Sequence, residues 1–144
     1  MKTLYTAHAT NKGGRNGHSE TSDGNLKVDL ASPGAPNAKP GTTNPEQLFA
    51  AGYSACFGSA LELVAKKQGV DASNAIIAAD VNLNQDDNGY FLSVTLKVTT
   101  PNVTGEAAQK LVEASHQICP YSKATRGNID VTLVVNEEPI KKAA

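Results

Sequence analysis

The sequence predicts an α+β domain in which antiparallel sheets pack around one long buried helix, with a second, amphipathic helix beside them. Three observations carry this prediction. First, two segments in which apolar and polar residues alternate flank a tight turn. Second, residues 48–60 form a helical run without charge. Third, residues 105–118 repeat apolar side chains at helical spacing. A chain of 144 residues fits one domain, 1–144, that buries a core without metal or disulfide staples.

The first 43 residues are predicted to form short strands and a long loop. Residues 4–9 and 26–30 contain apolar and β-branched side chains typical of strands, and Asp23-Gly24 is a turn signal before the second. Residues 32–43 contain three prolines, so we expect an irregular but stiffened connection there.

The central helix has clear predicted boundaries. Asn44 is a suitable N-cap, Pro45 favours the first helical position, and Gly69 can end the helix after two lysines. From residue 48 to residue 60 no face of this helix carries a charge. A helix that is apolar on every side is normally covered on every side, which predicts that sheets or a second subunit surround it.

The last part of the chain is predicted to read strand, strand, helix, strand. Residues 75–83 and 91–98 flank a hairpin turn at 86–89, and residues 129–135 form the final strand.

The second helix is expected from Gly105 to about Ile118, with Thr104 as its cap and Cys119-Pro120 as its end. One face of this helix carries Ala108, Leu111, Val112 and Ser115.

Composition excludes several classes of partner. The formal charge is −1, from 13 basic and 14 acidic residues, so there is no basic field for nucleic acid or an anionic membrane. No apolar stretch approaches the ~20 residues of a membrane span, and the N-terminus becomes polar by Thr10 without a secretory segment. We therefore expect a cytoplasmic protein with no nucleic-acid or membrane partner.

The two cysteines, Cys56 and Cys119, have neither disulfide-framework nor zinc-finger spacing. In a reducing compartment such a pair either fills the core or performs redox chemistry. A metal site that combines both with His8, His18 or His116 is disfavoured by the scattered spacing.

The sequence contains only two arginines but eleven lysines, and each arginine lies next to a glycine. Arg15 is either an exposed loop charge or a guanidinium that lowers the pKa of a nearby thiol. Arg126 is expected to tie down its own loop. Glu46 either favours the helix dipole or orients Arg15 through a bidentate pair. His116 would share a helix face with Cys119, as a base or as an ordinary buried histidine.

Glu46 and Cys56 are ten residues apart, which is about 15 Å along a straight helix. Glu46 therefore cannot easily reach the thiol of its own helix. If two such helices cross antiparallel near Ala51-Gly52, where the side chains are small, Glu46 of one approaches Cys56 of the other. Such helices can also pack this way within one subunit, but we expect a site at a dimer interface, with Glu46 and Cys56 from different chains.

Four aromatic residues that lie near Cys56 or Cys119 in the sequence can provide an apolar lining beside the thiols. The alternative, which we expect for at least two of the four, is that they are ordinary core residues. They are Phe49, Tyr53, Phe57 and Tyr121.

Taken in order, these motifs resemble the organic hydroperoxide resistance proteins of the OsmC superfamily. The likeness covers nearly the whole chain: AHATNKGGRNG at 7–17, SDGNL at 22–26, TNPEQLFAAGYSACF at 43–57 and CPYSKATRGNIDV at 119–131. This sequence departs from the family at Lys123, where asparagine is usual, and in a less glycine-rich loop before Thr42. Neither change touches a predicted catalytic position.

The resemblance implies a fold, a set of roles and partners. The fold is the OsmC-like one, an intertwined homodimer with the central helices inside. Cys56 is the peroxidatic thiol, Cys119 the resolving thiol, and Arg15 with Glu46 the activating pair. The implied substrates are alkyl and fatty-acid hydroperoxides. The implied reductant is a dihydrolipoyl group of a lipoylated protein, with no bound cofactor.

Two other functions stay open from the residues alone. One is an OsmC-type peroxidase with broader peroxide specificity, and selectivity for an alkyl chain would distinguish an organic hydroperoxide enzyme from it. The other is a non-catalytic module whose apolar interior holds a lipid or similar ligand, for which Cys56→Ser would leave binding intact.

Overall fold

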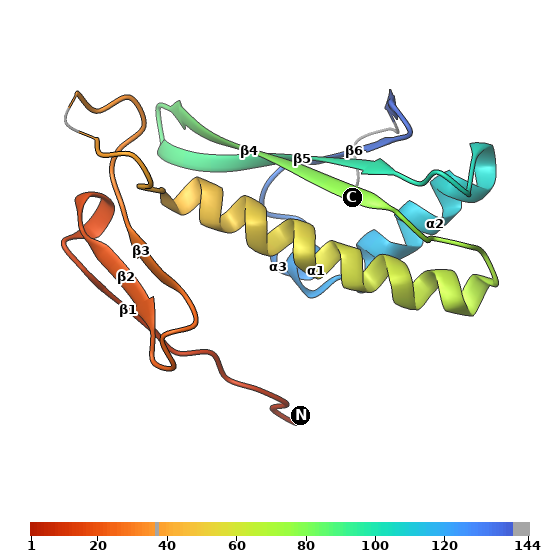
Figure 1. Cartoon of the computed structure of the whole chain (residues 1–144). Helices are drawn as coiled ribbons and strands as arrows, with labels where there is room; N and C mark the ends of the chain where they lie inside the picture. The colour runs from red at the N-terminus through yellow and green to blue at the C-terminus, as the bar shows by residue number, and fades with distance from the viewer. Residues whose placement is uncertain (37, 140–144) are drawn as a thin grey trace. The chain divides into compact units, whose positions relative to one another are not determined.

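The computed structural model describes residues 1–36 and 38–139, and the chain divides into two compact units, Met1–Leu48 and Phe49–Ala144. Between them they contain the strands and helices of an α+β fold (Figure 1).

The first unit holds an antiparallel sheet of strands β1 (Ala9–Lys12), β2 (His18–Thr21) and β3 (Lys27–Asp29) in that order. A short 3-10 turn, η1 (Gly14–Asn16), joins β1 to β2. Strand β3 confirms the strand predicted at 26–30, and the turn before it has Gly24 at φ +76°.

The strand predicted at 4–9 is wrong. The first strand begins only at Ala9, and the apolar side chains of Leu4 and Tyr5 are exposed. The turn between β1 and β2 sets the pairing, with Lys12 opposite His18, so the partner strand ends at Thr21 opposite Ala9. Strand β2 was missed because its four residues, His-Ser-Glu-Thr, carry no apolar alternation.

Helix α1 (Pro45–Gln68) confirms the central helix and both of its ends. The Asn44 side-chain oxygen accepts a hydrogen bond from the Gln47 N–H at 2.9 Å, which is an N-cap, and Gly69 adopts φ +69° after the last turn. One face of α1 is buried, whereas Ala51 and Ala55 are exposed. A single chain therefore covers only part of this apolar helix.

By length and hydropathy alone, α1 could also cross a membrane, contrary to the expectation that no apolar stretch is long enough. One such helix is weak evidence, because the core helix of a soluble protein has the same properties. A third of its most apolar window, 33%, is buried in this chain.

The second unit holds a four-stranded sheet in the order β4-β5-β6-β7. Strands β4 (Ile76–Asp86) and β5 (Gly89–Thr99) form the predicted hairpin, with Asp86 opposite Gly89. Strand β6 (Val131–Val135) confirms the last predicted strand, and β7 (Glu138–Pro139) pairs with it antiparallel.

One strand pair differs from the predicted antiparallel arrangement, because β5 and β6 are parallel. The helices between these strands explain the difference. A parallel pair needs a crossover connection that returns the chain to the same end of the sheet, and here helices supply it. They are α2 (Gly105–Ile118) and α3 (Pro120–Thr125).

Helix α2 confirms the predicted bounds and the buried face, but Thr104 forms no side-chain cap bond there. Helix α3 was missed. It starts immediately after Cys119 with Pro120 in its first turn, a position that suits a residue without an N–H.

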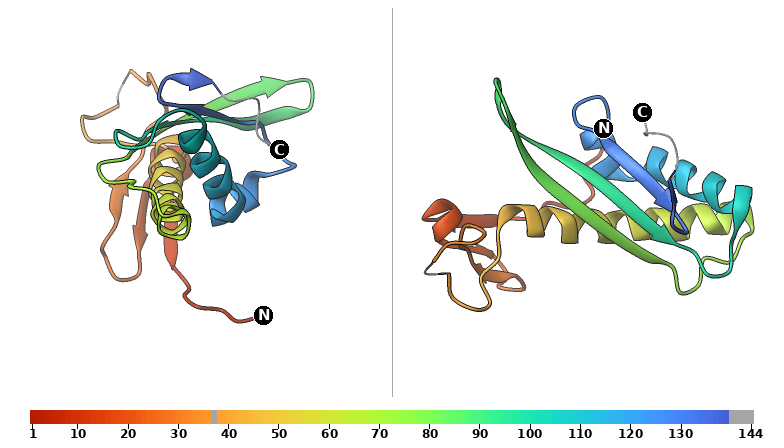
Figure 2. Two further views of the ribbon diagram at one scale, coloured as in Figure 1. Left: turned by 90° about the vertical axis from the view of Figure 1, so that its right-hand side faces the viewer. Right: turned by 90° about the horizontal axis from the view of Figure 1, so that it is seen from above.

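The core of the second unit lies between its sheet and two helices, α1 and α2, which cover the same face of the sheet (Figure 2). Fully buried side chains from all three meet there: Phe57, Leu61, Leu96, Leu111, Val112 and Leu133. Cys119 is part of this core, and Cys56, in the middle of α1, packs against it.

Candidate active site

The two thiols lie next to each other in the second unit. Cys56 projects from the middle of α1, and Cys119 sits between α2 and α3; their sulfur atoms are 3.7 Å apart. Both thiols are free, Cys119 is fully buried and Cys56 is partly exposed. A disulfide needs a separation of about 2.05 Å, so a small approach of the two sulfurs would close it. The structure thus brings together residues that are 63 positions apart in sequence.

The position of Cys119 follows from the break between two helices. Its backbone is extended, with ψ 123°, while its N–H still donates to the Ser115 carbonyl at 2.9 Å. Its own carbonyl accepts the N–H of Lys123 at 3.0 Å, inside the first turns of α3. The residue is therefore held at both ends by hydrogen bonds to two different helices.

Burial raises the pKa of the Cys56 thiol above its ordinary value. The backbone N–H of Tyr121 donates to this sulfur and lowers the pKa, whereas the neighbouring Cys119 raises it. Burial outweighs the single N–H donor. Within the second unit these surroundings favour the thiol of Cys56 over the thiolate, and a nucleophilic role requires a further group that favours the thiolate.

Three of the four predicted lining residues form an aromatic cluster beside Cys56. The Phe49 ring lies edge-on to Tyr53 and to Tyr121, with centroids 6.0 and 6.1 Å apart, and Tyr53 and Tyr121 are 5.6 Å apart. Tyr121 keeps 39% of its surface exposed, while Tyr53 and Phe57 are fully buried. Two of the four therefore lie in the core, as expected, whereas Phe49 is half-buried and Tyr121 is exposed.

Gly52 makes room for Tyr121 in this cluster. A Cβ at position 52 would lie 2.7 Å from the Tyr121 hydroxyl and 3.2 Å from two of its ring carbons. The Tyr121 ring therefore packs directly against the backbone of α1 at Gly52.

A buried polar network lies beside the thiols; the sequence singled out two of its members, Tyr53 and His116, but not Ser122 or Thr125. The Tyr53 hydroxyl is hydrogen-bonded to Ser122 at 2.8 Å and to Thr125 at 3.2 Å. The Ser122 hydroxyl is also bonded to Nδ1 of His116 at 2.8 Å. His116 is thus a buried, hydrogen-bonded histidine. Arg126 donates to the His116 carbonyl at 2.6 Å, which confirms that it ties down its loop.

Arg15 and Glu46 form a bidentate ion pair within the first unit. The guanidinium donates from Nη1 to Oε2 at 2.9 Å and from Nη2 to Oε1 at 2.6 Å. The pair holds the pKa of Glu46 below its ordinary value and raises the pKa of Arg15. Of the two alternatives for Glu46, orientation of Arg15 is confirmed.

The turn that carries Arg15 is closed by its own hydrogen bonds. The Asn11 side chain accepts from the Gly14 N–H at 2.9 Å and donates to Ser19 Oγ at the same distance. Gly13 adopts φ +91°, and a side chain at Gly17 would collide with the Lys12 carbonyl. The glycines flanking Arg15 are therefore required by the turn itself.

The other histidines are engaged elsewhere or exposed. His18 is bonded to Asp29 at 2.8 Å and to Glu20 at 2.9 Å, and His8 is exposed. Within residues 1–36 and 38–139, no three His, Cys, Asp or Glu side chains are placed to share a metal ion.

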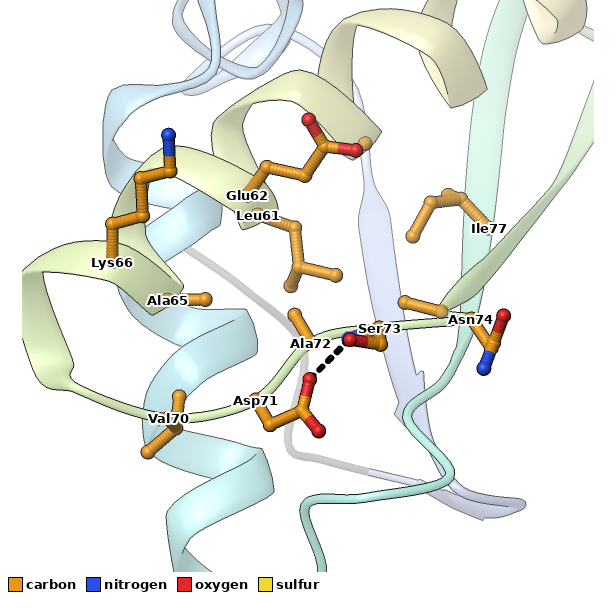
Figure 3. A pocket seen from close by; sticks show the side chains of 12 residues that line it. Leu61, Glu62, Ala65, Lys66, Val70, Asp71, Ala72, Ser73, Asn74 and Ile77 are labelled. Atoms are coloured by element: carbon orange, nitrogen blue, oxygen red, sulfur yellow. Dashed lines mark hydrogen bonds between the residues drawn. The ribbon is translucent and has the colours of Figure 1, made fainter.

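A separate cleft of about 480 Å³ opens between the C-terminal half of α1 and residues 70–77 (Figure 3). Leu61 and Ile77 line it, and Asp71 is hydrogen-bonded to Ser73 at its edge. Its lining includes neither cysteine and none of the other predicted site residues, so it is distinct from the thiol site.

Comparison with known proteins assigns the chain to a family. Residues 34–134 match the model of the OsmC-like protein family. This match covers more than half of the sequence and contains both cysteines and Glu46. The chain belongs to the OsmC-like family.

Within this family the chain is similar to proteins named for organic hydroperoxide resistance. It is 52% identical to organic hydroperoxide resistance protein OhrB of Bacillus subtilis, over 90% of this chain and 96% of that protein. The crystal structure of OhrB superposes with a TM-score of 0.84, at 51% identity over 92% of this chain and 99% of that chain. A Legionella pneumophila organic hydroperoxide resistance protein gives a TM-score of 0.86, at 47% identity over 93% and 98% of the two chains. The resemblance predicted from the motifs is confirmed.

Proposed function

We propose that this protein is a thiol peroxidase that reduces organic hydroperoxides to alcohols. The observation that carries the proposal is the 3.7 Å separation of Cys56 and Cys119 beside a partly exposed aromatic cluster. The names of its relatives support organic hydroperoxides as the substrate class.

The reaction divides into three steps. The Cys56 thiolate attacks one peroxide oxygen, so that an S–O bond forms, the O–O bond breaks and the leaving alkoxide takes a proton to become the alcohol. Cys119 then attacks the sulfur of the Cys56 sulfenic acid, forming the disulfide and releasing water. An external dithiol reduces this disulfide by exchange and is itself oxidised. A dihydrolipoyl group on a lipoylated protein is the proposed dithiol, and no bound cofactor is needed.

Activation of Cys56 is assigned to Arg15. Burial favours the thiol of Cys56 over the thiolate, so catalysis needs a cation that stabilises the thiolate and the negative charge developing on the peroxide oxygens. The bidentate pair with Glu46 presents the Arg15 guanidinium in a defined orientation.

The site is proposed to form between two chains of a homodimer. Glu46 and Cys56 lie ten residues apart on the same continuous helix, which is about 15 Å of rise. The exposed small residues Ala51 and Ala55 give a second copy of α1 room to approach closely. In this arrangement Glu46, with its bound Arg15, serves the Cys56 of the other chain.

Thiol counting tests the chemistry. Reduced protein is mixed with one equivalent of cumene hydroperoxide, and free thiols are counted in wild type, Cys56→Ser and Cys119→Ser. We expect two thiols to be lost rapidly in wild type, none in Cys56→Ser and about one in Cys119→Ser, whose sulfenic acid dimedone traps. Slow loss that is indifferent to Cys56 would contradict the proposal and favour a ligand-binding module. Equal rates with hydrogen peroxide would indicate a broader peroxidase.

A matched pair of variants tests the role of Arg15. The alkylation rate of Cys56 is followed against pH in a Cys119→Ser background, with Arg15→Ala compared with Lys12→Ala. Loss of Arg15 should raise the pKa of Cys56, whereas loss of the nearby Lys12 charge should leave it in place. An equal rise of the Cys56 pKa in both variants would mean that Arg15 acts only as one positive charge among others and not through its position.

Mixing two inactive variants tests the dimeric site. Cys56→Ser and Glu46→Ala chains are unfolded together and refolded to form mixed dimers. If Glu46 and Cys56 come from different chains, each mixed dimer contains one complete site, and about a quarter of the wild-type activity returns. If they come from the same chain, no mixed dimer has a complete site and no activity returns.

A further inference from the structure

Three buried polar residues each lie three positions along the chain from one of the two cysteines. Tyr53 precedes Cys56 by three residues on α1, and His116 precedes Cys119 by three residues on α2. Ser122 follows Cys119 by three residues on α3. The hydroxyl of Ser122 contacts both of the others, at 2.8 Å in each case.

This network joins the helices that carry the two thiols. Tyr53 and Ser122 are 0% exposed and His116 is 2% exposed, so water cannot replace the bonds between them. A hydroxyl group can donate one hydrogen bond while it accepts others, which lets Ser122 serve both partners. Removal of any one member takes one or two hydrogen bonds away from the remaining buried polar atoms, which is costly in the interior.

We propose that Tyr53, Ser122 and His116 are positioning residues that hold Cys119 for its attack on oxidised Cys56. The inference rests on the proposed function, in which Cys119 resolves the sulfenic acid. In that step the Cys119 S–H and the Cys56 S–OH become one S–S bond and one water molecule, so no other reactant is consumed. None of the three residues is itself a reactant in this step.

The backbone around Cys119 explains why a positioning network is needed. Cys119 lies at the break between α2 and α3, where its extended backbone interrupts the helix. Its thiol can meet Cys56 only if α3 keeps its place relative to α1. Besides core packing and the bond from the Tyr121 N–H to the Cys56 sulfur, the hydroxyl bonds from Tyr53 to Ser122 and Thr125 tie α3 to α1 directly. When α3 shifts, attack by Cys119 slows and Cys56 sulfenic acid remains exposed to a second peroxide, which carries it to sulfinic acid.

The test measures the attack of Cys119 without any peroxide. Reduced protein is treated with excess Ellman's reagent, which first forms a mixed disulfide at the more exposed Cys56. The Cys119 sulfur then attacks the Cys56 sulfur, the Cys56–Cys119 bond forms, and a second thionitrobenzoate leaves. The rate of the second release reports the positioning of Cys119. A failure of the peroxidase proposal would leave this rate unaffected, so the two failures can be told apart.

The variants are chosen to change single hydrogen bonds. Tyr53→Phe and Ser122→Ala should slow the second release about fivefold to tenfold, as expected for loss of one or two buried hydrogen bonds. Ser115→Ala is the matched control, because this fully buried serine donates only to the Leu111 carbonyl within α2. It should leave the second release unchanged.

His116 offers a pair of variants that separates position from stability. Asparagine places its amide where Nδ1 lies and should restore most of the rate, whereas glutamine places its amide farther out and should not. With cumene hydroperoxide, His116→Gln should also accumulate sulfinic acid at Cys56, read by mass spectrometry, while sulfenic acid formation keeps its rate. Equal rates of second release in His116→Asn, His116→Gln and wild type would overturn the proposal. An equal slowing by Ser115→Ala would overturn it as well.

Discussion

Replacement of Gly52 by alanine tests whether the aromatic cluster beside Cys56 is packed as described. The new Cβ would lie 2.7 Å from the Tyr121 hydroxyl oxygen and 3.2 Å from two of its ring carbons, inside the contact distance of about 3.5 Å for carbon atoms. Gly58 on the same helix provides the matched control, because a Cβ there would lie 3.7 Å from Ile77 Cγ1, an ordinary contact.

The two substitutions share a gain in helix propensity and differ in whether the new methyl group meets a neighbouring ring. Each gains about 1 kcal/mol from the higher helix propensity of alanine. Only Gly52→Ala must displace a neighbouring ring, and overpacking of this kind costs about 1–3 kcal/mol. We therefore expect Gly58→Ala to stabilise the protein and Gly52→Ala to be about 1–3 kcal/mol less stable than Gly58→Ala. At about 3 °C for each kcal/mol, the melting temperatures should differ measurably.

Urea unfolding followed by circular dichroism, at one protein concentration, measures both variants. A double variant then assigns the cause, since Gly52→Ala combined with Tyr121→Ala removes the ring that the new methyl group meets. The cost of Gly52→Ala should vanish in that background. Equal stabilisation by both alanines, or a cost that persists without Tyr121, would refute the packing argument.

Two further predictions concern pH. Hydrogen bonds to Asp29 and Glu20 raise the pKa of His18 above 6.5, so its stabilising effect is complete below that value and is lost as pH rises through the raised pKa. The urea midpoint should fall across that range, and His18→Gln should remove this fall. Bonds from Ser73 lower the pKa of Asp71 below 3.8, so its contribution is present above that value and disappears as pH falls through the lowered pKa. Asp71→Asn should reduce the loss of stability in acid, and an unchanged acid limb would contradict this assignment.

Local signals in the sequence were sufficient for the longest elements. The bounds of α1 follow from Asn44, Pro45 and Gly69, each of which acts on the backbone within one turn. Helix α2 and the hairpin of β4 and β5 are likewise set by periodicity and turn residues close to them. The motifs around both cysteines were also sufficient to predict the family.

Pairings between distant segments could not be predicted from local signals. The strand expected at 4–9 has the right residue types, but a strand forms only where a partner offers its hydrogen bonds, and the turn carrying Arg15 sets that partner from Ala9 onward. The same reason explains β5 and β6, whose parallel pairing depends on the crossover through two helices.

The candidate site also has features that the sequence predicts and features that only the tertiary structure determines. The residue types and their roles at Cys56, Cys119, Arg15 and Glu46 could be proposed from the sequence, because chemistry depends on side-chain identity. Only the tertiary structure decided that the sulfurs are 3.7 Å apart and that Ser122 bridges two buried side chains. A distance between atoms on separate helices depends on how those helices pack in the core, and no local sequence pattern specifies that packing.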